Sequence, residues 1–141
     1  MAGGRAGCQA LYDALAVPGS GGPGLSPRRD LAFDAYCMQH PGTYCRSAKS
    51  YAAHLTRLCC GLEYGGDPQV YRAIQRWLNG VVPLEKPEVL AKRGRTTVAD
   101  LQVAATRQEM ERLAQAWAEE VWKAYTPQHE IARGWIRLAR K

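Results

Sequence analysis

One carboxylate and two imidazoles in the first half of the chain are of the types that transfer protons or hold a metal. Asp34 and His40 lie in one predicted helix, and His54 lies in the next helix along the chain. At about 100° per residue, Asp34 falls on an apolar face between Leu31 and Met38. A buried carboxylate is costly unless it is paired, hydrogen-bonded or bound to a metal. The sequence therefore predicts a partner for Asp34.

That partner could be a tyrosine hydroxyl, a tryptophan N–H or a helix end, and the three histidines of the chain are the other candidates. Helical bundles use clusters of imidazole and carboxylate to hold Zn, Fe or Mn, and the metal can activate water. Under this hypothesis Asp34, His40 and His54 are catalytic residues and ligands of a divalent metal such as Zn or Fe, with His129 adding to the site. Under the alternative, each histidine is a satisfied core or cap residue, since no His-x-x-x-His or His-x-x-Glu spacing is present.

The five cysteines are expected to be free thiols. They include no Cys-x-x-Cys pair, so neither a disulfide framework nor a zinc ribbon is indicated. Cys8 is the candidate for a reactive or cofactor-binding thiol, because it lies at the start of a predicted helix, where the pKa of a thiol is lowered. Cys59 lies beside an apolar stripe and is expected to be buried.

Helices are the elements that must position these residues. Capping signals begin them at Ser26-Pro27, at Asp67-Pro68 and at Thr106-x-x-Glu109, and apolar residues recur at helical spacing between the signals. The expected helices cover about 8–16, 28–40, 47–63, 68–79, 98–104, 106–125 and 127–139. A flexible Gly/Pro linker is expected at 17–27 and a long connecting loop at 81–96, with one short turn near 88–91. No run alternates as a strand does, so residues 1–141 are predicted to form a single all-α domain, an irregular bundle of four to six helices.

The composition is that of a folded protein with 46% hydrophobic and 23% charged residues in 141. Four Trp and seven Tyr stand against one Phe, which favours rings that carry a polar group at core edges. No apolar stretch approaches the roughly 20 residues of a membrane span, and the first residues lack a secretory pattern. We expect no membrane association and a cytoplasmic location.

The formal charge of +6 is divided evenly between residues 1–87 and 88–141, with local clusters at 92–95 and 133–141. These clusters leave open a second class of function. The chain could be a non-enzymatic binding or scaffold protein that uses a basic, Trp-containing surface for a protein or nucleic-acid partner. The other interpretation of the clusters is an ordinary solvated surface. A homodimer is compatible with the sequence.

Several segments carry a resemblance to one family: Asp34-Ala-Tyr-Cys-Met-Gln-His-Pro41, Ser47 to Leu55, Thr97 to Leu101, and Trp117 to Trp122. The chain resembles a family of small bacterial proteins of unknown function with a D-x-Y-x-x-Q-H-P motif and a following S-x(6)-H-L helix. That family often carries an N-terminal Cys-x-x-Cys-Gly segment, which is absent here. The resemblance implies that Gln39 belongs with Asp34, His40 and His54, and it brings no activity with it.

The leading hypothesis is a small helical protein with a buried Asp/His site that binds a divalent metal or a small-molecule ligand. Asp34, His40 and His54 would carry hydrolytic or proton-transfer chemistry, with Cys8, Gln39 and His129 contributing to ligand or cofactor binding.

Overall fold

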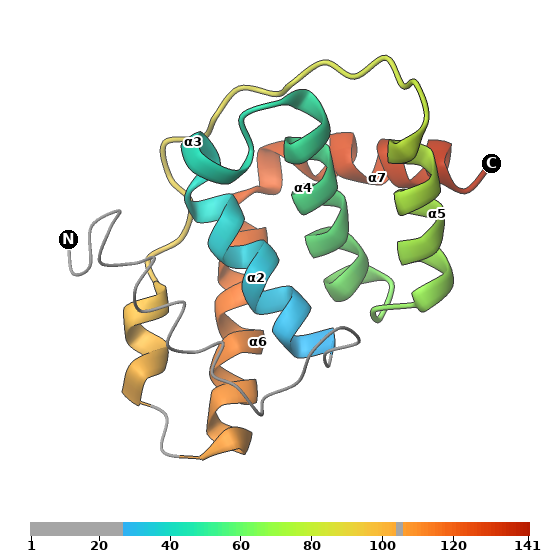
Figure 1. Ribbon diagram of the computed structural model, residues 1–141. Helices are drawn as coiled ribbons and strands as arrows, with labels where there is room; N and C mark the ends of the chain where they lie inside the picture. Colours follow the sequence, from blue (N-terminus) through green and yellow to red (C-terminus); the bar gives the residue numbers. More distant parts are fainter. Residues whose placement is uncertain (1–26, 104–105) are drawn as a thin grey trace.

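The computed structural model describes residues 27–103 and 106–141, and every regular element in these ranges is a helix (Figure 1). The elements are α2 (Pro27–Gln39), α3 (Pro41–Tyr44), α4 (Ala48–Glu63), α5 (Pro68–Asn79), the 3-10 helix η1 (Val98–Val103), α6 (Arg107–Ala124), the 3-10 turn η2 (Thr126–Gln128) and α7 (His129–Ala139). The predicted all-α bundle is confirmed. The helix expected at about 8–16 lies outside the described residues, as does the linker expected at 17–27 apart from Pro27.

Local capping explains where three of the helices begin. The hydroxyl of Ser47 accepts a hydrogen bond from the backbone N–H of Ser50 at the start of α4, at 3.0 Å. Asp67 caps α5 by accepting from the N–H of Gln69 at 2.9 Å, and Thr106 caps α6 in the same way. These contacts satisfy N–H groups that have no partner inside the helix.

Two glycines follow the end of helix α4. Gly65 and Gly66 have φ angles of 62° and 71°, which other residues rarely adopt. The N–H of Gly66 donates to the carbonyl of Cys60 at 3.0 Å, a bond from six residues further on that is typical of a glycine-terminated helix. The chain then reverses into α5, which lies beside α4 in Figure 1.

Helix α2 is the centre of the bundle. It crosses α6 and also packs against α4, and six of the residues from Leu31 to Met38 are at most 3% exposed. Phe33, at 37% exposed, departs clearly from this burial. A helix that is buried nearly all round gives its polar groups little access to water, so they must be satisfied by neighbouring elements.

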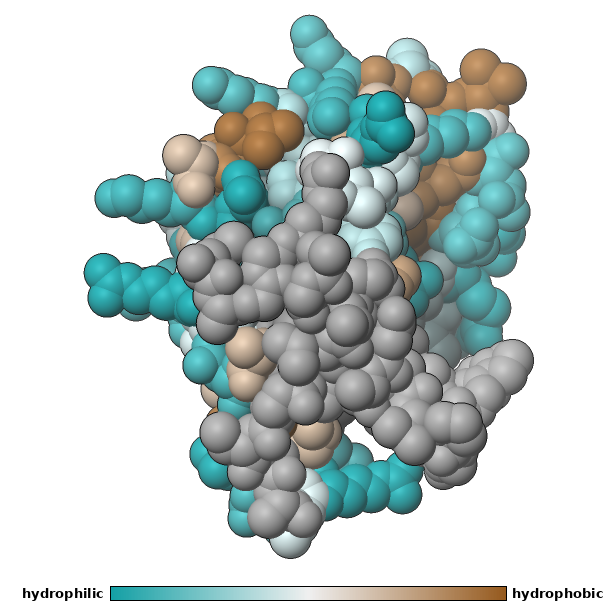
Figure 2. Space-filling model, turned by 60° about the vertical axis from the view of Figure 1, so that its left-hand side comes forward, coloured by the Kyte–Doolittle hydropathy of each residue, from teal (hydrophilic) through white to brown (hydrophobic). Residues whose placement is uncertain are grey.

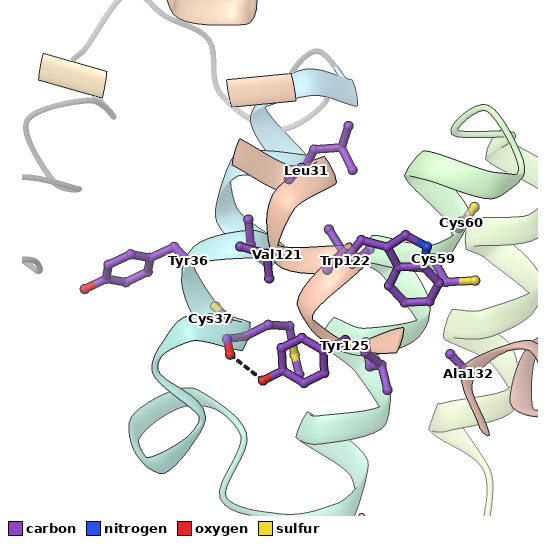
Figure 3. Close-up of a cluster of buried hydrophobic side chains, with 14 of the residues drawn as sticks. Leu31, Tyr36, Cys37, Cys59, Cys60, Val121, Trp122, Tyr125 and Ala132 are labelled. Atoms are coloured by element: carbon purple, nitrogen blue, oxygen red, sulfur yellow. Dashed lines mark hydrogen bonds between the residues drawn. The ribbon is translucent and has the colours of Figure 1, made fainter. Parts of the chain in front are cut away.

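Three aromatic side chains of the core donate hydrogen bonds to other elements, one of them drawn in Figure 3. The hydroxyl of Tyr125 donates to the backbone carbonyl of Met38 on α2. The indole N–H of Trp117 donates to the side-chain oxygen of Gln39 at 3.1 Å. The hydroxyl of Tyr51 donates to the side-chain oxygen of Gln128 at 2.5 Å. The excess of Trp and Tyr over Phe in the composition therefore corresponds to rings that join helices through hydrogen bonds.

The connection formed by residues 80–97 contains no helix and runs across one end of the bundle, past α4 and α3 (Figure 1). It is held by side chains. Lys49 donates to the carbonyl of Gly80 at 2.9 Å, and the amide of Gln128 donates to the carbonyl of Glu88 at 2.7 Å. Residues 81–96 form neither helix nor strand, and the short turn expected near 88–91 does not form.

The second half of this connection is anchored to α2 and α6. The amide of Gln39 donates to the carbonyls of Arg93 and Thr96, at 3.2 and 2.6 Å, and the Nε of Arg93 donates back to the carbonyl of Gln39 at 3.1 Å. The carboxylate of Glu120 accepts from the N–H groups of Arg95 and Thr96. Gly94, between Arg93 and Arg95 in the sequence, has a φ of 97°, a conformation that favours glycine.

Two short elements differ from the sequence expectation. Pro41 lies beyond the helix expected at 28–40, and it occupies the first position of α3, a one-turn helix that was not expected, where its missing N–H costs nothing. The helix expected at 98–104 is a 3-10 helix.

No helix in the described ranges has both the length and the apolarity to cross a bilayer. On the side seen in Figure 2, hydrophilic side chains project between separate apolar areas.

Candidate functional site

The contact between α2 and α4 places Asp34 against the face of α4 that carries His54 and Arg57. The two helices approach closely because α4 has a glycine at the crossing: a Cβ on Gly61 would collide with the side chain of Leu31. The side chain of Asp34 is only 1% exposed. The two partners lie three residues apart on α4, so they project from one side of that helix.

Asp34 uses one carboxylate oxygen for each partner. Its Oδ1 lies 3.0 Å from Nδ1 of His54, and its Oδ2 accepts from Nε of Arg57 at 3.2 Å. The side chain of His54 is 16% exposed and that of Arg57 is 34% exposed. Asp34 is expected to be buried with a partner, and its partners are the imidazole of His54 and the guanidinium of Arg57. These partly exposed groups balance the negative charge of the buried carboxylate.

The contact with Asp34 determines the tautomer of His54. A carboxylate only accepts hydrogen bonds, so Nδ1 of His54 must carry the proton. In the neutral ring, the lone pair then lies on Nε2. No hydrogen bond to Nε2 is present within the described part of the chain. Phe33 packs edge-on against the ring, with centroids 5.5 Å apart, and limits its rotation.

Arg57 was not identified from the sequence. It spans from Asp34 on α2 to α5, where its guanidinium carbon lies 5.8 Å from the centre of the Tyr71 ring. A signal was present, because Arg57 follows His54 by three residues and therefore shares its face of the helix. The site consequently contains one buried anion and a permanent cation beside the imidazole.

His40 has different surroundings. It lies at the N-cap of α3, and its ring packs against Tyr36 with centroids 4.7 Å apart. Tyr36 in turn contacts Tyr44 at 5.4 Å. The described residues contain no group of three His, Cys, Asp or Glu side chains arranged to hold a metal ion. The structure therefore joins Asp34 to His54 and does not add His40 to them as a third ligand.

His129 belongs to a second polar cluster, at the junction of α6 and α7. Its ring stacks on Trp122 at 3.8 Å, and its Nε2 donates to the carbonyl of Trp122 at 2.6 Å. Glu63, at the end of α4, accepts the indole N–H of Trp122 at 3.0 Å and two hydrogen bonds from Arg133. The hydrogen bonds from Arg133 lower the pKa of Glu63, with a smaller contribution from Trp122. The cluster thus joins α4, α6 and α7, with His129 linking the last two.

The remaining candidate residues are Gln39 and the cysteines. The amide of Gln39 is fully engaged by the connection and by Trp117, so it anchors protein segments to one another. Cys8 lies outside the described residues. The other four cysteines are free and buried, and burial raises the pKa of Cys45 and of Cys59 to about 12. Such thiols are poor nucleophiles.

These features define a class: small all-α proteins in which a buried aspartate fixes a histidine and an arginine on the neighbouring helix. The model of a family described as a family of unknown function (DUF5946) matches residues 1–126, and the chain belongs to this family. The resemblance seen in the sequence is thereby confirmed at the level of an uncharacterised family. No curated protein and no solved structure matches the chain. The matched range includes the whole Asp34, His54 and Arg57 cluster and ends before α7.

Proposed function

We propose that Asp34 and His54 form a binding site for a small ligand or a divalent metal, in which Nε2 of His54 is the reactive atom. The observation that carries this proposal is the 3.0 Å contact between Nδ1 of His54 and a carboxylate that is almost fully buried. This contact leaves Nε2 as the basic nitrogen of the ring, and the hydrogen bond to Asp34 on the opposite side fixes the orientation of the ring.

Proton transfer is the chemistry that needs only this pair. A carboxylate behind an imidazole holds the productive tautomer and stabilises the imidazolium that forms when Nε2 takes a proton. The proton would come from a hydroxyl group of the bound ligand or from a water molecule beside it. Its transfer to Nε2 is the first step of hydrolysis or of an isomerisation. Arg57 pairs with the same carboxylate and offsets its negative charge, so Asp34 does not repel an anionic ligand from the site.

A divalent metal is the other occupant that this geometry suits. Metal-bound histidines generally donate their second ring nitrogen to a carboxylate or carbonyl, and Asp34 is placed to accept from His54 in this way. Nε2 would be one ligand, and water or ligand oxygens would have to supply others. We place this activity in the cytoplasm, where the buried free thiols of the chain would stay reduced.

Nitrogen-detected NMR of the histidine rings tests the proposal directly, because the chain has only three histidines. We expect the His54 ring to be protonated at Nδ1 and to have its lone pair on Nε2. We then expect Zn²⁺, or a small oxyanion such as phosphate or acetate, to shift the Nε2 resonance of His54 in a saturable way. The resonances of His40 and His129 serve as internal references and are assigned with His40→Gln and His129→Gln.

The variant Asp34→Asn separates a functional pair from a structural one. Loss of the carboxylate should weaken binding of the active probe by about 10- to 100-fold, the usual effect of removing a carboxylate behind a metal-binding histidine. Probes that leave the His54 resonances unmoved in the native protein, or a proton found on Nε2, contradict the proposal. Equal binding by the native protein and Asp34→Asn contradicts it as well.

A further inference from the structure

The positive charge of the chain is concentrated on α5 and on residues 129–141. These two segments contain six Lys or Arg and one Glu, which gives them five of the six net positive charges of the whole chain. This concentration does not appear when the chain is divided into halves. It becomes visible because α7 packs against α5, and Figure 1 shows the C-terminal half of α7 crossing that helix.

Most of these cations form no ion pair with a carboxylate in the described part of the chain. Arg133 is bound by Glu63 and Glu130, so it is neutralised within the protein. Four of the others are exposed and form no ion pair with the described residues: Arg72, Arg76, Arg137 and Lys141. The preference of a helix C-terminus for cations accounts for those at the end of α7. It does not account for Arg72, which lies in the middle of α5.

Exposed aliphatic side chains lie among the charges on α7. Ile131 is 39% exposed and Leu138 is 52% exposed, and they are two of the five large hydrophobic residues exposed in the described ranges. Their separation of seven residues puts them on one face of the helix, and Trp135, partly buried between them in sequence, packs against the core. The buried face of α7 is a different one, formed by Ala132 and Ile136.

We propose that the outer face of α5 and α7 docks an acidic amphipathic helix of a partner protein. Such a helix offers carboxylates to the unpaired cations and an apolar stripe to Ile131 and Leu138. A nucleic acid fits less well, because its phosphates use cations but gain nothing from aliphatic side chains. The tryptophans of these helices pack against the core, so they are not platforms on which bases stack. This surface does not depend on the Asp34 and His54 site.

The test uses a synthetic helical peptide with leucines along one face and glutamates on the other, and a scrambled peptide of the same composition. Binding to the full chain is measured by fluorescence anisotropy at about 0.15 M salt, where the Debye length is about 8 Å. We expect saturable binding of the amphipathic peptide that weakens as salt is added, and clearly weaker binding of the scrambled peptide.

Four variants locate the surface. Arg76→Glu on α5 and Arg137→Glu on α7 should each weaken binding by about three- to tenfold. Leu138→Ser should weaken it by about threefold without changing the charge, because it removes part of the apolar contact. Arg112→Glu, an exposed reversal on α6, is the control and should leave binding unchanged. All four side chains are exposed, so the melting temperature should stay close to that of the native protein and confirm that each variant folds.

Three results overturn the proposal. The first is equal binding of the scrambled and amphipathic peptides, or binding that Leu138→Ser does not affect. The second is tighter binding of duplex DNA or of anionic lipid vesicles than of the amphipathic peptide, which would assign the face to another class of partner. The third is self-association of the native chain that Leu138→Ser abolishes, which would make a second copy the occupant.

Discussion

Replacement of Asp34 by asparagine should cost about 2 kcal/mol of unfolding free energy. The carboxylate is 1% exposed and accepts from His54 and Arg57, at 3.0 and 3.2 Å. A hydrogen bond to a charged group contributes about 1.5–3 kcal/mol. The lower end applies here, because the side chain of Arg57 is one-third exposed and water can replace part of its lost partner. Asparagine keeps an acceptor for one partner but turns a donor toward the other.

Urea unfolding monitored by circular dichroism measures this loss, and an unchanged m-value would show that the unfolded state is the same. The matched control is Asp67→Asn, which makes the same chemical change at a helix N-cap, where Asn and Asp are equally effective. We expect less than about 0.5 kcal/mol of change for the control. A loss of the same small size for Asp34→Asn would refute the assignment of Asp34 as a buried acceptor for two partners.

The coupling between Asp34 and Arg57 can be isolated in a double-mutant cycle. Arg57→Gln should destabilise the native protein by more than it destabilises Asp34→Asn, since the carboxylate that pairs with Arg57 in the native protein is already gone in that variant. Strictly additive losses would mean that the 3.2 Å contact contributes no net free energy in solution.

Three further outcomes follow from other parts of the structure. Gly94→Ala should destabilise the protein by about 1–3 kcal/mol in urea unfolding, because φ is 97° and a Cβ would lie 3.3 Å from the amide nitrogen of Gln39; no change would refute this conformation. The pKa of Glu63 is lowered by its hydrogen bonds from Arg133, so its contribution is present above the unfolded-state pKa and is lost as the pH falls through the lower folded-state value. The stability lost in Arg133→Gln should therefore be largest near neutral pH and shrink in acid, and a difference that does not vary with pH would contradict the ion pair. In a Cys8→Ser variant, the four buried thiols should resist a disulfide reagent at pH 8 until urea is added, because burial raises their pKa; rapid reaction without urea would contradict that burial.

The sequence predicts the helices well because their ends carry strong local signals. Asp67-Pro68 and Thr106 cap helices as expected, and the two glycines after α4 end it. The 3-10 geometry of residues 98–103 was not predicted, because the sequence provides a cap and apolar spacing for either type of turn. The one-turn helix at Pro41 was missed because a proline ends one helix and suits the first position of the next.

The site was predicted in part. Helical periodicity places Asp34 on a buried face, and that inference depends only on the helix itself. Which histidine meets it depends on the crossing of α2 and α4, which distant packing decides. His40 and His129 are as close to a helix end or core edge as His54 is, yet the first contacts Tyr36 and the second stacks on Trp122. The role of Gln39 could not be read from its motif, since its partners lie in the connection, more than fifty residues along the chain.

Helix α2 makes bonds in three directions from one rigid rod. Asp34 holds α4, the carbonyl of Met38 accepts from Tyr125 after α6, and Gln39 holds the connection at residues 93 and 96. A shift of this helix along its axis would therefore strain all of these contacts together. A ligand at His54 that draws Asp34 toward it would therefore also disturb the hydrogen bonds between Gln39 and the connection. Hydrogen exchange of the backbone amides in residues 80–97 would then report that the site is occupied, although none of these residues belongs to it.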